Sequence, residues 1–404
     1  MKISRRAVLH ISALSAGLLA LEGCAATGTG WLGDGLLAWL RALWGGTEPE
    51  AASSSAAPAV SEAASGAASG AAEAVLPVYD ADPLTGEARR SAGRLVGVMV
   101  NNISNSQKQN ARPQRGIGAA GLLIESKVEG GISRLCAVFS DVDAIPELGP
   151  IRSGRDQFLQ LLMPWRALYY HDGESIFCTQ IIHQWSYWDL NIGGKSYFNT
   201  PTHPHVAHRD SRGRNVAFEH TEFTSGKEIR QAAQSAGIRL DEACEGTLFR
   251  FADYRTGEVN RLEGERAARA VQITHSDHYK TAFAYDAASA TYRMQMYSRA
   301  AKAYEDTVDE LTGEQLRFAN LLVCFAPIAA YPGDSADVQQ VNYAAGGAAY
   351  LFTQGRVQAG EWTKPAPDQP LRVYDPRGEE LLLNRGRTYL ALVDEDEWTN
   401  FSYQ

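Results

Sequence analysis

The sequence predicts an α+β fold, in which a mixed α/β layered domain is followed by a smaller, mostly antiparallel β domain. A continuous apolar run at residues 95–100 is typical of a strand buried on both faces. Strand-like and helix-like segments alternate from there to Gly237, which indicates a layered α/β arrangement. Beyond Gly237, short β-branched and aromatic runs separated by Gly, Pro and Asn indicate an antiparallel sheet.

The elements of the first half follow from local signals. Ser225 and Glu228 fit a capping box that opens a helix, and Gly237 fits its end. The other elements expected there are strands at 95–100, 123–129, 132–140 and 167–170 and helices from Ser153 and over 175–184. The strands expected in the second half are 271–274, 282–285, 292–297, 321–325, 350–352, 357–362, 371–374, 381–383 and 388–393.

Residues 1–24 have the features of a bacterial lipoprotein signal. A basic start is followed by an apolar run over 7–21 and by Leu-Glu-Gly-Cys, so Cys24 is expected to carry the lipid. The alternatives are a plain secretory signal or a membrane helix, but about 15 apolar residues fall short of the roughly 20 that a spanning helix needs. Residues 4–9 also resemble a twin-arginine signal, which leaves the export route open. We expect an extracytoplasmic protein anchored to the cell membrane.

Composition divides the rest of the chain. A Trp-rich segment followed by an Ala/Ser-rich tether occupies 25–75, because that composition buries too little apolar surface to fold. We expect an N-terminal domain at 76–240, a connection at 241–264 and a C-terminal domain at 265–396. These 404 residues, 45% of them hydrophobic, suffice for two cores.

Charge and motifs exclude several function classes. With 38 basic and 47 acidic residues the net charge is -9, which argues against a nucleic-acid-binding surface. The chain has no Gly-x-Ser-x-Gly, Walker, dinucleotide or His-Glu-x-x-His motif, so no cofactor and no catalytic residue are assigned.

Charged residues gather around Gly130-Gly131, which reads as a two-residue hairpin turn. Glu129 would then oppose Ile132 and Glu125 would oppose Cys136, which places Arg134 on the same face between the two glutamates. A glycosidase could use two carboxylates, but these lie roughly 13 Å apart along a strand, too far for either hydrolytic geometry. Charge balance of Arg134 is the preferred interpretation.

Residues 149–155 predict an anion site at the start of a helix capped by Ser153. The first N–H groups of a helix are unpaired, and Arg152 and Arg155 would add forks suited to carboxylate or phosphate. Arg112 is a further contributor. Alternatively, both arginines tie the loop to carboxylates such as Asp141 or Glu147.

Metal and thiol chemistry find little support. His203, His205 and His208 form H-x-H-x-x-H in a loop containing Pro204, but no metal site is assigned. No cysteines have C-x-x-C spacing. Buried free thiols are expected at Cys136 and Cys324, and the state of Cys178 and Cys244 is left open.

Several segments together resemble the YerB-like bacterial lipoprotein family, which has N- and C-terminal domains of unknown function 3048. They are Val-Met-Val-Asn-Asn at 98–102, Ala-Arg-Pro-Gln at 111–114, Glu-Gly-Gly-Ile-Ser-Arg at 129–134, Gly-Pro-Ile-Arg-Ser at 149–153, and later segments at 349–352, 360–362, 374–375 and 383–388. The resemblance implies a lipid-anchored, two-domain extracytoplasmic protein near cell-wall synthesis. At 217–220 this chain reads Ala-Phe-Glu-His where the family tends to have Ala-Pro-His-Asn, which puts any role of His220 in doubt.

Two hypotheses on function remain. The favoured one is an anchored binding or regulatory lipoprotein of the cell envelope that contacts cell-wall polymer or its synthases. The alternative is an uncharacterised enzyme acting on cell-wall glycan. The candidate ligand-binding residues are Arg112, Glu125, Glu129, Arg134, Arg152, Ser153, Arg155 and His171.

Overall fold

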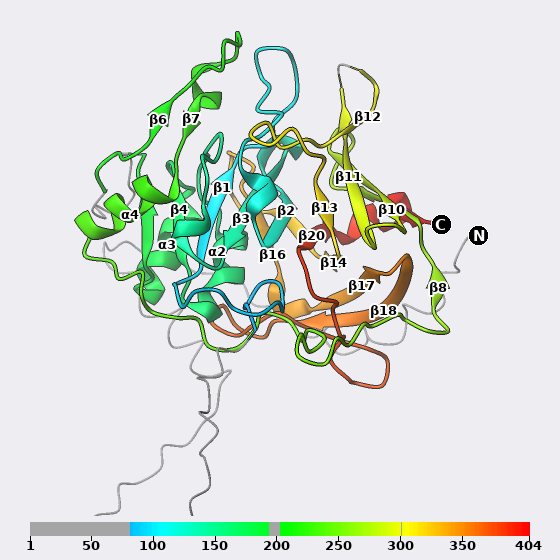
Figure 1. The fold of residues 1–404 in the computed structure, drawn as a ribbon. Coiled ribbons are helices and arrows are strands. Elements are labelled where there is room, and N and C mark those ends of the chain that lie inside the picture. The colour runs from blue at the N-terminus through cyan, green and yellow to red at the C-terminus, as the bar shows by residue number, and fades with distance from the viewer. Residues whose placement is uncertain (1–80, 194–202, 300) are drawn as a thin grey trace, which may run out of the picture. The chain divides into compact units, whose positions relative to one another are not determined.

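A computed structural model describes residues 81–193, 203–299 and 301–404 (Figure 1). The chain divides into two compact units, Met1–Glu73 and Ala74–Gln404, and all described residues belong to the second. The predicted signal, Cys24 and the tether lie outside the described residues. Within the described part, no helix has both the length and the apolar character needed to cross a membrane.

One mixed sheet of eleven strands draws on both halves of the chain. Its order is β19-β18-β17-β14-β20-β2-β3-β1-β4-β5, with β8 paired to β18. Its strands are β1 (Val96–Val100), β2 (Leu122–Lys127), β3 (Ser133–Phe139), β4 (Leu168–His171), β5 (Asp189–Asn191), β8 (Arg266–Ala267), β14 (Asn320–Ala326), β17 (Gly347–Thr353), β18 (Arg356–Thr363), β19 (Arg372–Tyr374) and β20 (Thr388–Asp394). The red strand β20 lies parallel to the cyan strand β2, so the two halves share backbone hydrogen bonds (Figure 1).

The predicted buried strand at 95–100 is confirmed as β1, which runs antiparallel to β3 and parallel to β4. Val96, Val98 and Val100 face one apolar cluster, whereas Met99 faces the other. Side chains alternate along a strand, so a sheet covered on both faces needs apolar residues at every position. Gly97 permits a close approach, because a Cβ there would lie 2.3 Å from Leu162 Cδ1.

In the described part of the chain, three α-helices cover the sheet: α2 (Asp156–Leu162), α3 (Ile176–Trp185) and α4 (Gly226–Ser235). The capping of α4 is confirmed, since Ser225 Oγ accepts a hydrogen bond from Glu228 N. Ser175 caps α3 in the same way. The α2 and α3 side chains pack in the Met99 cluster, while those of α4 pack in the Val96 cluster on the opposite face.

The predicted helix start at Ser153 is wrong. Helix α2 begins at Asp156 with Arg155 as N-cap, and no side chain caps it. Gly154 N donates to Gly173 O, and Gly154 forms an isolated bridge with Glu174. This pairing keeps 153–154 outside the helix, so helical geometry cannot begin before Arg155.

A second, antiparallel sheet of six strands belongs to the second half. Its order is β12-β11-β10-β9-β21, with β13 paired to β11, and it packs on the main sheet partly through the Phe283–Tyr389 ring contact at 4.8 Å. Its strands are β9 (Ala270–Thr274), β10 (Lys280–Asp286), β11 (Thr291–Ser298), β12 (Ala303–Asp306), β13 (Arg317–Phe318) and β21 (Ser402–Tyr403). Two separate strand pairs join β6 (His208–Arg209) to β7 (Glu222–Phe223) and β15 (Ile328–Ala330) to β16 (Gln339–Val341). The α+β class is confirmed, but the segment expected as a strand at 381–383 forms only one isolated bridge, between Leu383 and Phe251.

The hairpin of β2 and β3 exists, but its predicted register is wrong by one residue. Lys127 pairs with Ser133, and Glu125 pairs with Leu135. A three-residue 3-10 turn, Glu129–Gly131, replaces the expected two-residue loop, with both glycines at positive φ. A one-residue shift moves a side chain to the other face. Arg134, which pairs with Ser126, therefore lies on the face opposite Glu125.

Candidate functional site

Glu125 is a buried carboxylate at the junction of the two halves, and its side chain is 1% exposed. From the first half, Ser133 Oγ donates to Oε1 at 2.6 Å and Asn102 Nδ2 donates to it at 3.2 Å. From the second half, Thr281 Oγ1 and Tyr389 OH donate to Oε2 at 2.9 and 2.6 Å. Both oxygens are satisfied by protein donors, so Glu125 has a structural role.

The electrostatics of Glu125 agree with this role. Burial raises the pKa of a carboxyl group, but His275 and the Ser133 and Tyr389 hydroxyls outweigh burial, so the pKa of Glu125 is lowered. His275 Nε2 lies 3.6 Å from Oε2. An ionised carboxylate that four donors hold resists both protonation and exposure.

Arg112 connects this network to a cavity. Its Nε donates to Asn102 Oδ1 at 2.9 Å, and its Nη1 donates to Tyr297 O at 3.1 Å. The guanidinium carbon lies 5.7 Å from the centre of the Tyr279 ring. Burial lowers the pKa of Arg112, although Glu125 partly opposes this shift. Two fixed nitrogens hold the orientation of the guanidinium.

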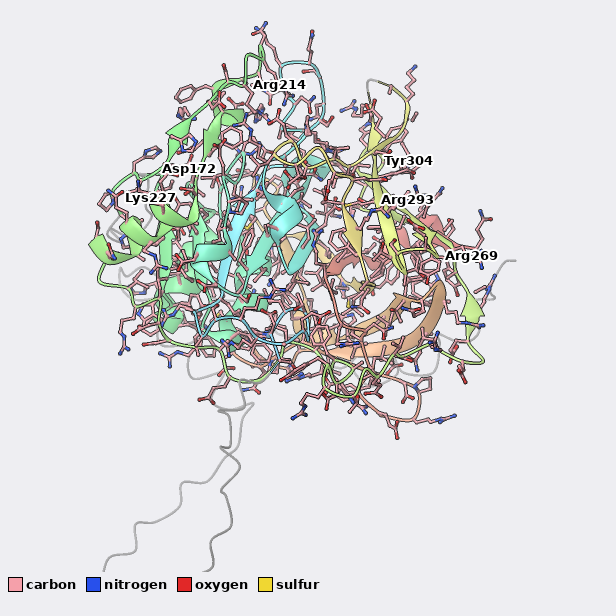
Figure 2. All side chains as sticks on the ribbon, in the orientation of Figure 1. Asp172, Arg214, Lys227, Arg269, Arg293 and Tyr304 are labelled. Atoms are coloured by element: carbon pink, nitrogen blue, oxygen red, sulfur yellow. The ribbon has the colours of Figure 1, made fainter. Side chains whose placement is uncertain are left out.

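The cavity has a volume of about 750 Å³ and lies between residues 104–114 and the hairpin of β11 and β12. Figure 1 shows this cyan loop opposite the yellow hairpin, and Figure 2 shows Tyr304 and Arg293 on the second sheet. Most of its lining residues carry hydrogen-bonding side chains. They are Ser104, Ser106, Gln107, Asn110, Arg112, Pro113, Gln114, Met296, Ser298, Ala301, Glu305, Asp306, Thr307 and Val308.

Four other candidates form a separate cluster. Arg155 binds Glu129 through two nitrogens, with Nη2 donating to Oε2 at 3.1 Å. Arg134 Nη1 donates to Ser153 O at 2.8 Å, and its Nη2 lies 4.0 Å from Glu129 Oε2. Glu129 therefore pairs with two arginines. This agrees with the alternative that Arg155 ties the loop to a carboxylate, but that carboxylate is Glu129 and not Asp141 or Glu147.

Arg152 and His171 lie at the carboxyl ends of β1 and β4. Arg152 N donates to Met99 O, and Asp172 N donates to Arg152 O. The Arg152 guanidinium makes no hydrogen bond to described residues. Burial lowers the pKa of Arg152, and the carboxylates of Glu219, Asp172 and Glu222 partly oppose this shift. Burial and the neighbouring Asp172 raise the pKa of Glu222 to about 7. Figure 2 places Asp172 in the green part of the fold.

The eight candidates thus divide into three groups, and the 750 Å³ cavity is lined by Arg112 but by none of the other seven. Sequence reasoning missed Thr281, Tyr389 and the β12 wall of the cavity. The position of Asn102, a polar residue directly after a buried strand, is the kind of sequence feature that indicates a functional site. Thr281 and Tyr389 are more than 150 positions from Glu125, and no local pattern marks such partners.

Three further histidines, His205, His208 and His220, have protein partners, and the described thiols are buried. His205 contacts Glu222, and His208 Nδ1 lies 2.9 Å from Glu228 Oε1. His220 is buried against Asn101 and Gln109. The described cysteines, Cys136, Cys178, Cys244 and Cys324, are free and buried, which confirms the expectation for Cys136 and Cys324.

Comparison with known proteins assigns the chain to a family. Residues 84–239 match the N-terminal domain of a protein of unknown function (DUF3048), and residues 270–390 match its C-terminal domain. The chain belongs to the DUF3048 family. This DUF3048 chain is 26% identical over 321 residues to "Putative lipoprotein YerB" of Bacillus subtilis strain 168, an alignment that covers 78% of this chain and 86% of that protein.

A solved structure supports the fold of the DUF3048 chain. The crystal structure of YerB from Bacillus subtilis has a TM-score of 0.64 and 21% sequence identity to it, and the match covers 80% of this chain and 99% of the other. The two proteins therefore share a fold across both family domains.

Proposed function

We propose that this protein is a membrane-anchored lipoprotein of the cell envelope that binds a polar segment of cell-wall polymer in the Arg112 cavity. The observation that carries the proposal is the cavity of about 750 Å³ with its polar lining at the junction of the two halves. Ligand sites have volumes of about 300–1,000 Å³ and use a few placed polar groups for specificity. The cavity is large enough for a short stretch of such a polymer.

The lining favours a ligand rich in hydroxyl and amide groups. Asn110 and Gln114 offer both donors and acceptors, and Ser298 offers a hydroxyl. The fixed charges have both signs, since Arg112 faces the same space as Glu305 and Asp306. Mixed charges suit a hydroxyl- and amide-bearing glycan better than a simple anion.

Location supports the same proposal. The lipoprotein-like signal ends at Cys24, and the related YerB protein is described as a putative lipoprotein. The Ala/Ser-rich tether, with about 50 residues, would span on the order of 40 Å root-mean-square. That reach would place the cavity away from the bilayer and near wall material.

The anion-site hypothesis at 149–155 now depends on Arg152. Arg155 is paired with Glu129, and α2 is a short helix with no side-chain cap. Arg152 has carboxylates around it, which compete with an anionic ligand. An acidic surface of an envelope synthase is therefore a weaker proposal than a polymer in the cavity.

The test is binding of wall-glycan fragments to the full chain in detergent. We expect Arg112→Met to weaken binding at least tenfold, because the guanidinium is the fixed donor of the cavity. Arg293→Met is the matched control, since Arg293 is an exposed arginine on β11 outside the cavity. Wild-type protein that binds no fragment, or equal affinities for all three proteins, would contradict the proposal.

The same incubation separates binding from catalysis. Fragments recovered after binding should have unchanged chain lengths if the protein only binds. Shorter fragments, produced by wild type and not by Arg112→Met, would favour the alternative of an enzyme acting on glycan.

A further inference from the structure

Three titratable side chains outside the cavity converge at the ends of β4 and β5. His171 ends β4, Glu174 follows it, and Asp189 begins β5. His171 Nε2 lies 3.2 Å from Asp189 Oδ2 and 3.7 Å from Glu174 Oε2. One ligand atom from each residue lies within 4.8 Å of the other two. The three atoms therefore surround one small volume.

Two atoms of this group are buried and lack a hydrogen bond of good geometry, although Asp189 lies close to His171 and Asn191 lies close to Glu174. His171 is fully buried and the Glu174 side chain is 4% exposed. Within the described residues, neither His171 Nε2 nor Glu174 Oε2 makes a hydrogen bond of ordinary geometry. Leaving buried polar atoms unpaired is costly, so each such atom calls for an explanation.

The far sides of the same residues are held in place. His171 Nδ1 lies 2.8 Å from Gly173 O, and because a carbonyl only accepts, Nδ1 carries the proton. Thr179 Oγ1 donates to Glu174 Oε1 at 2.6 Å. Gly154 packs on the imidazole, where a Cβ would lie 3.0 Å from His171 Cγ. Outer hydrogen bonds of this kind orient the ligands of a metal ion.

With Nδ1 protonated, a neutral His171 directs the lone pair of Nε2 toward two carboxylates. That arrangement is repulsive unless a cation lies between the three atoms. In tetrahedral coordination, bonds of about 2.0–2.2 Å place ligand atoms about 3.4 Å apart. The observed 3.2 and 3.7 Å bracket this separation.

We propose that His171, Glu174 and Asp189 form a binding site for a divalent transition-metal ion. The imidazole ligand favours Zn²⁺ over Mg²⁺ and Ca²⁺, which prefer oxygen ligands alone, and the two carboxylates also suit Mn²⁺. Asp189, whose side chain is 16% exposed, lies on the accessible side of the site. Three protein ligands leave a coordination position for water or a ligand group.

The competing interpretation is an imidazolium ion between two carboxylates. It needs no metal, and it predicts that the chain binds Zn²⁺ no better than its exposed histidines allow. The two interpretations differ in stoichiometry and in which substitutions abolish binding.

The experiment is equilibrium dialysis of the full chain in detergent against Zn²⁺ and, separately, Mn²⁺, after removal of bound metal with a chelator. We expect one ion per chain. Glu174→Gln and Asp189→Asn should each lower the affinity at least tenfold, because each loses a charged ligand. His183→Gln removes an exposed histidine at the end of α3 and should leave binding unchanged.

Two further measurements complete the test. The bound ion should raise the thermal midpoint of wild type but not that of Asp189→Asn, whose partly exposed position spares the fold. His205→Gln examines the H-x-H-x-x-H loop as a competing site. Absence of binding by folded wild type, or binding lost in His205→Gln and retained in Asp189→Asn, would overturn the proposal.

Discussion

Single residues in this protein obtain their roles from burial. Glu125 and Glu129 are only four positions apart, yet one is held by four neutral donors and the other by two arginines. The sequence indicated that Arg134 would contact a carboxylate, and Glu129 is that carboxylate. The sequence could not indicate that Glu125 lies on the face of the sheet opposite Arg134, because one added residue in the turn shifts the strand register and so decides the face.

Asp156 illustrates how burial creates a pH dependence. Its side chain is fully buried, Oδ1 has no hydrogen-bond partner among the described residues, and Tyr331 OH donates to Oδ2 at 2.8 Å. Burial raises its pKa from 3.8 to about 6. Because the pKa of Asp156 is raised in the folded state, its contribution to the free energy of unfolding is most favourable below about pH 3.8, where the group is protonated in both states. This contribution is lost as pH rises through 6, because ionisation then favours the unfolded chain.

We therefore predict that Asp156→Asn stabilises the protein at pH 7.5. The gain is at most about 3 kcal/mol, since the shift is roughly two pKa units and each corresponds to about 1.4 kcal/mol. Thermal unfolding at pH 7.5 and at pH 4 measures it, and the gain should be smaller at pH 4. Asp277→Asn, at an exposed aspartate, is the control. An equal gain at both pH values would contradict the prediction.

At the scale of elements, local patterns succeed where a strand or helix has its own signal. Residues 95–100, the cap at Ser225 and the end at Gly237 carry such signals, and the structure confirms them. The predicted start of α2 is wrong, because the hydrogen bond from Gly154 N to Gly173 O outweighs the capping preference of Ser153. Tertiary hydrogen bonds of this kind leave no trace in a local pattern.

The contact between β1 and α2 gives a prediction at this scale. Gly97→Ala should destabilise the protein by about 1–3 kcal/mol, because the new methyl group would overlap buried Leu162. Chemical denaturation measures the loss.

A double variant identifies the cause. Leu162→Val shortens the opposing side chain, so Gly97→Ala should cost less in that background than in wild type. Equal costs in both backgrounds would place the strain elsewhere.

At the scale of the whole molecule, the two family domains share one sheet. Strand β20 of the second domain lies between β14 and β2, and Glu125 accepts hydrogen bonds from both halves. The cavity is likewise bounded by both, with residues 104–114 on one side and β12 on the other. A binding site at such a junction requires both halves to be folded together.

Anchoring also belongs to this scale. We predict that Cys24→Ser releases the protein from membranes, because the lipoprotein signal predicts that the lipid is attached to the sulfur of Cys24. Sedimentation of membranes and incorporation of labelled lipid measure the effect, and His183→Gln serves as an unrelated substitution. A Cys24→Ser protein that still sediments, together with wild type that incorporates no label, would contradict the lipoprotein prediction.

The sequence by itself determined the α+β class, the buried strand β1, the helix cap at Ser225 and the family, because these depend on neighbouring residues and on ordered motifs. Only the tertiary structure decided the hairpin register, the sheet shared by both halves and the grouping of the candidates. It alone brought Glu174 and Asp189 to His171. The shared sheet joins residues far apart in the chain, whereas the register and the His171 cluster depend on backbone geometry that no local pattern fixes, because they follow from how strands pair and helices pack.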